Sequence, residues 1–234
     1  MTSILAGCFG KALQLSKAAD DPMTATWVLA TLAQQACDLG HGRWAIRMAH
    51  AAIDAARSAD APPRAIAELL VRQARANAVT VHNAGAHDAH TRRQVTELLA
   101  QADAAFAKGT SDRDPAWSAE FGEAELAAEA GYCWRRVGEP QRAALYAEQA
   151  LRGFGTAYAR STQFNQIHAA EAYLDQGELE HALAYARAAV PAAKTLTSTR
   201  AIGHVRAFAT QIHPHRTTRQ VKEFNDYLTT ELAG

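Results

Sequence analysis

Apolar side chains recur at helical spacing along most of the chain, and short polar or glycine-containing stretches separate the periodic segments. Within residues 163–196, two such segments meet at Gln176-Gly177-Glu178. Small residues lie along one face of each segment, at Ala170, Ala182, Ala186 and Ala189. Small side chains at this spacing allow two antiparallel helices to approach each other closely. The stretch therefore predicts a helical hairpin that reverses at Gly177.

The hairpin pattern occurs three times. The pattern is a small residue, an aromatic residue, a glycine at the turn and then three further small residues. In the hairpin of residues 163–196 these are Ala170, Tyr173, Gly177, Ala182, Ala186 and Ala189. The same order stands 39 residues earlier, at Gly131, Trp134, Gly138, Ala143, Ala147 and Ala150. A third copy lacks the aromatic residue and comprises Ala33, Ala36, Gly40, Ala45, Ala49 and Ala52. These positions resemble the tetratricopeptide repeat, in which a helix pair of about 34 residues stacks on copies of itself. Trp134, at the signature aromatic position, is expected in the core.

Turn signals between the periodic segments predict ten or eleven antiparallel helices and no strand. The fold class is therefore expected to be all-α, a right-handed superhelical array of helix pairs like a tetratricopeptide solenoid. We expect one domain over residues 1–234, with pairs at about 22–59, 63–108, 114–154 and 157–195 and a capping pair at 197–232. Such an array needs no single large core, because each pair contacts only its neighbours.

Prolines and glycines give the local predictions. Asp114-Pro115 is typical of a helix start, and we expect that helix to reach about Val137. Pro191 predicts a kink or an early end, because an interior proline removes a hydrogen bond and clashes with the preceding turn. Gly138 and Gly177 are expected at positive φ, where a β-branched residue would be strained.

Composition and charge favour a soluble helical protein. Apolar residues make up 48%, yet the mean hydropathy is −0.23, as happens when alanine supplies much of the apolar count. Lysine plus arginine equals aspartate plus glutamate at 24 each, so direct nucleic-acid binding is not expected. No apolar stretch approaches the roughly 18 residues of a membrane span, and no signal-peptide pattern is present. Neither membrane insertion nor export is indicated.

The cysteines are few and scattered. Cys8, Cys37 and Cys133 are odd in number and lie outside any C-x-x-C. This pattern excludes a disulfide framework and a cysteine zinc site. A reducing cytoplasm fits it best.

Histidines cluster at His82, His87 and His90, with Asp88 beside them. Imidazole with carboxylate is a reasonable zinc or nickel ligand set. The H-E-x-x-H motif is absent, however, and histidines on a polar loop are usually solvated. No metal and no other cofactor is therefore predicted.

Catalytic motifs are missing. The sequence holds no G-x-S-x-G elbow, no G-x-x-x-x-G-K-[ST] phosphate loop and no G-x-G-x-x-G after a strand. Glu123 and Glu125 fall on different faces of a helix, so they cannot share a proton. The chain is not expected to be an enzyme.

The first helix of each pair lines the groove that a repeat stack offers to ligands, and helical spacing names the residues expected there. They are charged, amide and aromatic residues: Trp27, Gln34, Asp38, Glu68, Arg75, Glu125, Tyr132, Arg135, Arg136, Phe164, Glu171 and Asp175. Aromatic residues supply buried area and charges fix orientation, so this concave face suits an extended peptide or a segment of a partner protein. The alternative is a solvated face with ordinary salt bridges between neighbouring helices.

Charge has an order along this groove. Arg75, Arg135 and Arg136 come from the two middle pairs, whereas Asp38 and Asp175 come from the pairs on either side. The groove is therefore expected to be positive at its centre. A partner should offer an acidic group there, held bidentately by a guanidinium.

A second resemblance extends over roughly residues 24–232. Its quoted positions are Asp114-Pro115-Ala116-Trp117, Phe121, Glu123-Ala124-Glu125-Leu126-Ala127, Gly131-Tyr132-Cys133 and Ala157-Tyr158-Ala159-Arg160-Ser161. They are similar to the C-terminal sensor region of bacterial regulators that join a lambda-repressor-like helix-turn-helix domain to tetratricopeptide-like repeats. Those regulators carry their DNA-binding domain at the N-terminus, and too few residues precede residue 24 for one. We expect an excised domain or a stand-alone relative.

From these observations we expect the chain to be a non-catalytic regulatory binding module in the cytoplasm. A peptide, protein segment or small ligand in the groove would change the superhelical pitch and so act in transcriptional regulation or signalling. The alternative is a structural adaptor between proteins without a ligand switch. A homodimer is a further assembly that the sequence leaves open.

Overall fold

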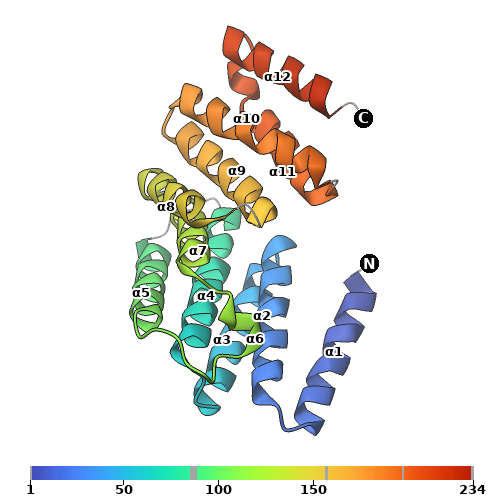
Figure 1. The fold of residues 1–234 in the computed structure, drawn as a ribbon, viewed down its shortest axis with the longest axis vertical. Coiled ribbons are helices and arrows are strands. Elements are labelled where there is room, and N and C mark those ends of the chain that lie inside the picture. The colour runs from blue at the N-terminus through green and yellow to red at the C-terminus, as the bar shows by residue number, and fades with distance from the viewer. Residues whose placement is uncertain (1, 85–88, 156–157, 197, 233–234) are drawn as a thin grey trace. The chain divides into compact units, whose positions relative to one another are not determined.

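The computed structural model describes residues 2–84, 89–155, 158–196 and 198–232 (Figure 1). Within these ranges it holds twelve α-helices, the 3-10 helix η2 (His213–His215) and no strand. None of the described helices is long and apolar enough to cross a membrane. The helices form two compact units, an N-terminal one over Met1–Gly122 and a C-terminal one over Glu123–Gly234.

The N-terminal unit is built from two helical hairpins, α2–α3 and α4–α5, with α3 packed on α4 and α1 on α2. Its helices are α1 (Thr2–Ala18), α2 (Pro22–Asp38), α3 (Gly42–Ser58), α4 (Pro63–Ala84), α5 (Ala89–Phe106) and the short α6 (Ala116–Ala119).

Local signals explain the first hairpin. The Asp21 carboxylate accepts a hydrogen bond from the Thr24 backbone N–H at 3.0 Å, and Pro22 stands at the first helical position of α2. Gly40 takes φ 76° where the chain reverses. Gly42 lies so close to Thr80 that a Cβ at that position would collide with the Thr80 hydroxyl. A missing side chain thus allows α3 to pack tightly on α4.

The C-terminal unit repeats the hairpin plan, with α7 packed on α8, α8 on α9, α9 on α10, and both α11 and α12 on α10. Its helices are α7 (Glu123–Arg136), α8 (Pro140–Gly153), α9 (Ala159–Asp175), α10 (Leu179–Thr195), α11 (Thr199–Gln211), the 3-10 helix η2 (His213–His215) and α12 (Arg219–Glu231).

Its core is alanine-lined at the hairpins and aromatic at the end. A Cβ on Gly131 would lie 3.2 Å from both the Ala143 carbonyl oxygen and the Ala147 nitrogen, so α7 and α8 nearly touch. Phe208 and Phe224 are fully buried edge to face, with ring centroids 6.0 Å apart. Large side chains therefore close the core where the hairpin alanines end.

The predicted positive φ at both turn glycines is confirmed. Gly138 and Gly177 each have φ 81°. At each turn a backbone N–H after the glycine bonds back to the preceding helix, as from Glu178 to the Tyr173 carbonyl at 2.9 Å. Such a bond caps carbonyls that the helix leaves unpaired.

The single helix predicted from Pro115 to Val137 is wrong. The chain forms α6, leaves the helix after Ala119 and starts α7 at Glu123. Phe121 is buried in the break, and its ring meets that of Phe106 edge to face at 6.1 Å. Burial of this ring, followed by a poor helix former at Gly122, offsets the loss of helical hydrogen bonds.

A kink or an early helix end was predicted at Pro191. The early end is wrong, and the kink stays a prediction. Helix α10 contains Pro191 and continues to Thr195. Val190 and Ala193 on either side are fully buried, and the Thr195 hydroxyl donates to the Pro191 carbonyl at 3.0 Å. Tertiary packing of this last turn outweighs the local cost of the proline.

Candidate ligand-binding face

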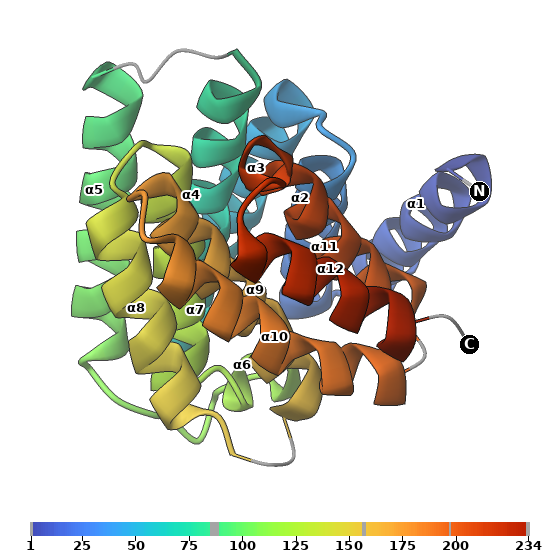
Figure 2. The ribbon, with the colours of Figure 1, turned by 90° about the horizontal axis from the view of Figure 1, so that it is seen from above.

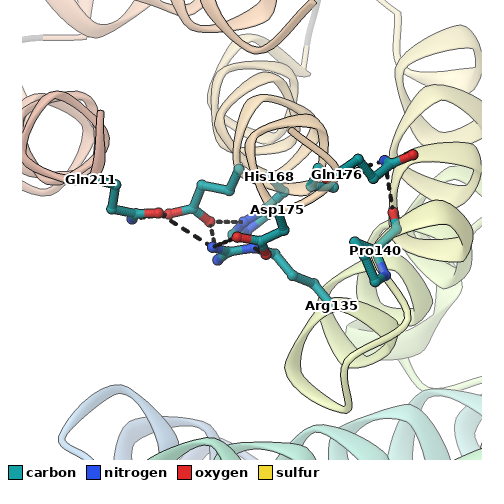
Figure 3. Close-up of polar contacts among 8 residues, drawn as sticks. Arg135, Pro140, His168, Asp175, Gln176 and Gln211 are labelled. Carbon is teal, nitrogen blue, oxygen red and sulfur yellow. Dashed lines mark hydrogen bonds and ion pairs between the residues drawn. The ribbon is translucent and has the colours of Figure 1, made fainter. Parts of the chain in front are cut away.

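Arg135, in the last turn of α7, ties together three helices of the C-terminal unit (Figure 3). Its Nε donates to Asp175 Oδ2 at 2.7 Å and its Nη1 donates to Glu171 Oε2 at 2.8 Å, both on α9. Gln211 of α11 donates from Nε2 to the other oxygen of Glu171, also at 2.8 Å. The side chains of Arg135 and Glu171 are only 14% and 13% exposed, so this ion pair is well shielded from water.

Glu171 is the electrostatic centre of this network. Burial by itself would raise the pKa of Glu171, but contact with His168 Nδ1 at 3.6 Å, the Arg135 charge and the Gln211 hydrogen bond together lower it to about 2. The carboxylate is therefore ionised at neutral pH, and its charge is neutralised by Arg135. The main role of Arg135 is therefore to hold α7, α9 and α11 together.

Beside the Arg135 network, four rings form a continuous row that we call the aromatic row. They are Tyr132, His168, His204 and Phe164. Tyr132 meets His168 at a centroid distance of 5.4 Å, and His168 faces His204 at 6.3 Å. His204 then meets Phe164 at 4.7 Å. All three contacts are edge to face, and all four residues are half-buried. The row begins on α7, passes through α9 and α11, and ends at Phe164 on α9.

An arginine lies over each end of the row. The Arg136 guanidinium carbon is 4.8 Å from the Tyr132 ring centroid, and that of Arg200 is 5.2 Å from the Phe164 centroid. A cation over the face of a ring is attracted by the ring, and a guanidinium carries its N–H donors in its own plane. Flat apolar surface with a cation at each end is suited to a partner segment that carries carboxylates.

The structure brings six of the twelve predicted groove residues together on this face, which we call the α7–α9–α11 face. They are Tyr132, Arg135, Arg136, Phe164, Glu171 and Asp175. The seventh prediction in the C-terminal unit, Glu125, is half-buried in the first turn of α7.

The other five predictions lie in the N-terminal unit, and three of them are joined. The Gln34 amide donates to Asp38 Oδ1 at 3.1 Å within α2. Asp38 in turn pairs with Arg75 of α4, whose Nη2 lies 3.7 Å from Asp38 Oδ1. Arg75 is 9% exposed. Like Arg135, it forms an ion pair between neighbouring helices, which is what the alternative interpretation of the groove expects.

The last two predictions do not share one environment. Glu68 is 5% exposed and accepts a hydrogen bond from Arg72 Nε at 3.1 Å, one turn along α4. Trp27 of α2 is 43% exposed. Glu68 thus has one partner within its own helix, while Trp27 has an exposed aromatic surface.

Sequence reasoning missed His168, His204, Arg200 and Gln211. A signal for His168 was present, because residues 164, 168, 171 and 175 follow helical spacing on one face of α9. Helix α11 was interpreted as a cap, so its inward face was not searched.

The metal hypothesis falls mostly outside the described residues. His87, Asp88 and the side chain of His82 are not among them, and His90 is exposed at the start of α5. Among the side chains that the structure does describe, no group of three or more His, Cys, Asp or Glu residues could hold a metal ion.

Comparison with solved structures identifies the architecture. A crystal structure of a putative kinesin light chain with nearly identical TPR-like repeats, from Podosopora anserina, matches with a TM-score of 0.59. It is 16% identical, and the match covers 91% of this chain and 96% of that one. This chain has a tetratricopeptide-like fold. A second crystal structure, of a variant of the same Podosopora anserina protein, matches at 17% identity with the same TM-score and coverage.

Such low identity shows the fold alone. No protein-family model matches the chain, and a search of curated proteins found no match. What the face binds must therefore be argued from its own residues.

Proposed function

We propose that the chain is a non-catalytic binding module whose α7–α9–α11 face holds an acidic segment of a partner protein. The observation that carries the proposal is the pair of arginines, Arg136 and Arg200, stacked at the two ends of the aromatic row. A partner segment lying along the row would place carboxylates at the guanidinium edges and apolar groups on the rings between them.

The Arg135 network supports this function indirectly. Because Arg135, Glu171 and Gln211 fix α7, α9 and α11 against one another, the rings are already in position before a ligand arrives. Preorganisation of this kind lowers the entropy that binding costs.

A regulatory role in transcription or signalling is the finer part of the proposal. It is supported by the resemblance of residues 24–232 to the sensor region of helix-turn-helix regulators. A ligand that bridges α7, α9 and α11 would favour one packing of these helices over others, since a repeat array can shift between neighbouring pairs. Buried Cys37 and Cys133, which form no disulfide, suit a reducing cytoplasm.

The experiment is a peptide selection. Random twelve-residue peptides displayed on phage are selected on the intact chain, and the selection is repeated on Arg136→Ala and Arg200→Ala. We expect enrichment of Asp and Glu around an apolar residue with the wild type, and its loss with either variant. A matched control is Arg206→Ala, because Arg206 is exposed on the same helix as Arg200. Enrichment of basic peptides, or the same peptides from all four proteins, would contradict the proposal.

A structural adaptor is the second candidate, favoured by the cross-helix ion pairs that stiffen the face. X-ray scattering with and without a selected peptide separates the two. A sensor changes its scattering profile on binding, whereas an adaptor binds without doing so.

A further inference from the structure

Asp175 stands at the end of a helix that disfavours its charge. It is the last residue of α9, which packs on both α8 and α10 (Figures 1 and 2). The C-terminus of a helix carries partial negative charge, so a carboxylate there is repelled. The adjacent Gln176 shows the favourable arrangement, because its amide donates to the Ala172 carbonyl at 3.1 Å and to the Pro140 carbonyl at 3.2 Å. Helix stability therefore does not explain an aspartate at position 175.

The Asp175 carboxylate occupies one edge of the Arg135 guanidinium (Figure 3). Its Oδ2 accepts a hydrogen bond from Nε at 2.7 Å, and its Oδ1 accepts one from Nη2 at 3.4 Å. This is the bidentate arrangement in which a guanidinium recognises a carboxylate. Among the described residues, Arg135 is the only polar partner of the Asp175 carboxylate.

Arg135 holds its two carboxylates unequally. Glu171 is 13% exposed and also accepts a hydrogen bond from Gln211, whereas the side chain of Asp175 is 41% exposed. An exposed aspartate can change rotamer and turn into water, while Glu171 keeps α7 and α9 joined. Arg135 itself is only 14% exposed, so a rotation of Asp175 uncovers the Nε edge of the guanidinium.

The Nε edge belongs to the Tyr132 end of the aromatic row. Arg135 and Arg136 follow Tyr132 by three and four residues, so all three lie on one side of α7. A partner segment whose carboxylate binds Arg136 therefore has Arg135 beside it. A second carboxylate of the same segment, in place of Asp175, would accept from the same two donors.

We propose that Asp175 occupies a carboxylate site on Arg135, and that an acidic partner segment binds there by displacing Asp175. The inference rests on the proposed function, because it adds a second anchor for the same acidic segment. Asp175 thereby acts as a specificity determinant. A segment with one carboxylate at this end binds Arg136 alone, whereas a segment with two adjacent carboxylates also displaces Asp175 and binds Arg135.

The test compares the wild type with Asp175→Asn, which keeps the side-chain shape but removes the charge and one of the two acceptor oxygens. The probe is succinate, titrated into the full chain while nuclear magnetic resonance follows the Arg135 Nε–H signal. We expect saturation at a concentration at least about tenfold lower in Asp175→Asn, because a charge-assisted competitor has been removed. Equal concentrations in the two proteins, or no shift of this signal in Asp175→Asn, would overturn the proposal.

The matched control is Glu178→Gln, which removes the same charge three residues further along the chain. Glu178 is exposed and pairs with His181 at 2.8 Å, so Arg135 keeps both of its carboxylates in this variant. Its succinate affinity should change by less than about twofold, because exposed charges are screened. Equal gains in Asp175→Asn and Glu178→Gln would reduce the effect to net charge and refute the displacement. Asp175→Ala repeats the comparison with no acceptor oxygen, so the result does not depend on a single variant.

A defined peptide separates this inference from the proposed function. Acetyl-Glu-Glu-Leu-Leu-Glu-Glu-amide carries adjacent carboxylates at both ends, and its affinity is measured by titration calorimetry. We expect it to bind the wild type and to bind Asp175→Asn about tenfold more tightly. Equal affinity for the two proteins would support the acidic partner and refute the role of Asp175. Binding to neither protein, while succinate still distinguishes them, would contradict the acidic partner and support the carboxylate site on Arg135.

Discussion

Arg135 of α7 and Glu171 of α9 are 36 residues apart in sequence and meet at 2.8 Å with both side chains almost enclosed. A charge that loses its partner at such a site keeps its desolvation cost and loses its compensation. We expect Arg135→Met to lower the free energy of unfolding by about 3 kcal/mol, measured by urea denaturation.

The control for that prediction is Arg152→Met. Arg152 pairs with Glu148 at 3.9 Å while 71% exposed, so it should lose less than about 1 kcal/mol. Equal losses in the two variants would mean that the Arg135 network contributes no more than a surface pair.

The same network predicts acid sensitivity. The pKa of Glu171 is lowered from 4.5 in the unfolded reference to about 2 in the folded protein. The stability that Glu171 contributes is therefore fully present above about pH 5 and is lost as the pH falls toward 2. Wild type should lose about 3 kcal/mol more than Glu171→Gln between those limits. Parallel pH profiles of unfolding free energy in the two proteins would contradict this assignment.

Gly177 tests the turn of the α9–α10 hairpin. Its φ is 81° and a Cβ there would meet nothing within 4 Å, so a substitution is penalised by backbone strain and not by a clash. Gly177→Val should lower stability by about 1 kcal/mol or more, seen as a lower melting temperature. Gly177→Asn should be milder, because asparagine tolerates this backbone region. A melting temperature unchanged by valine would count against the strain argument.

Gly131 and Gly203 form a matched pair of helix glycines. At Gly131 a Cβ would press on the α8 backbone at 3.2 Å, whereas at Gly203 it would meet nothing within 4 Å. Alanine should therefore destabilise at Gly131 and stabilise at Gly203 by about 0.5 to 1 kcal/mol, because alanine is the better helix former. Thermal unfolding of the two variants gives the comparison, and a gain in both would mean that α7 can move away from α8.

Features that recur in each repeat could be predicted from the sequence, whereas contacts that occur only once could not. Trp134 was expected in the core because it stands at a repeated position, and it is 5% exposed. The helix is interrupted at Phe121, whose ring packs against Phe106 of α5. No residue near Phe121 in the sequence indicates this contact. Helical spacing grouped Arg135 with Tyr132 and Arg136 on α7. It did not identify the residues of α9 and α11 that Arg135 contacts, because the spacing within one helix says nothing of what a neighbouring helix presents.

Arg136 provides the most direct test of the binding face. It differs from its neighbour Arg135 because its described contact is with the face of the Tyr132 ring, 4.8 Å away, whereas Arg135 is engaged by two carboxylates. Arg136→Ala should weaken a selected acidic peptide by about 1 to 3 kcal/mol, measured by titration calorimetry, because a charge-assisted hydrogen bond is lost. Its unfolding free energy should change by less than about 1 kcal/mol, since a partly exposed cation on a ring contributes little to folding.

Arg136→Lys separates charge from shape: lysine keeps the charge but cannot form the planar, bidentate contact, so it should recover only part of the affinity. Full recovery by lysine would show that the site senses charge alone. Lost stability with unaltered binding in Arg136→Ala would mean that Arg136 braces the helices and that the ligand lies elsewhere.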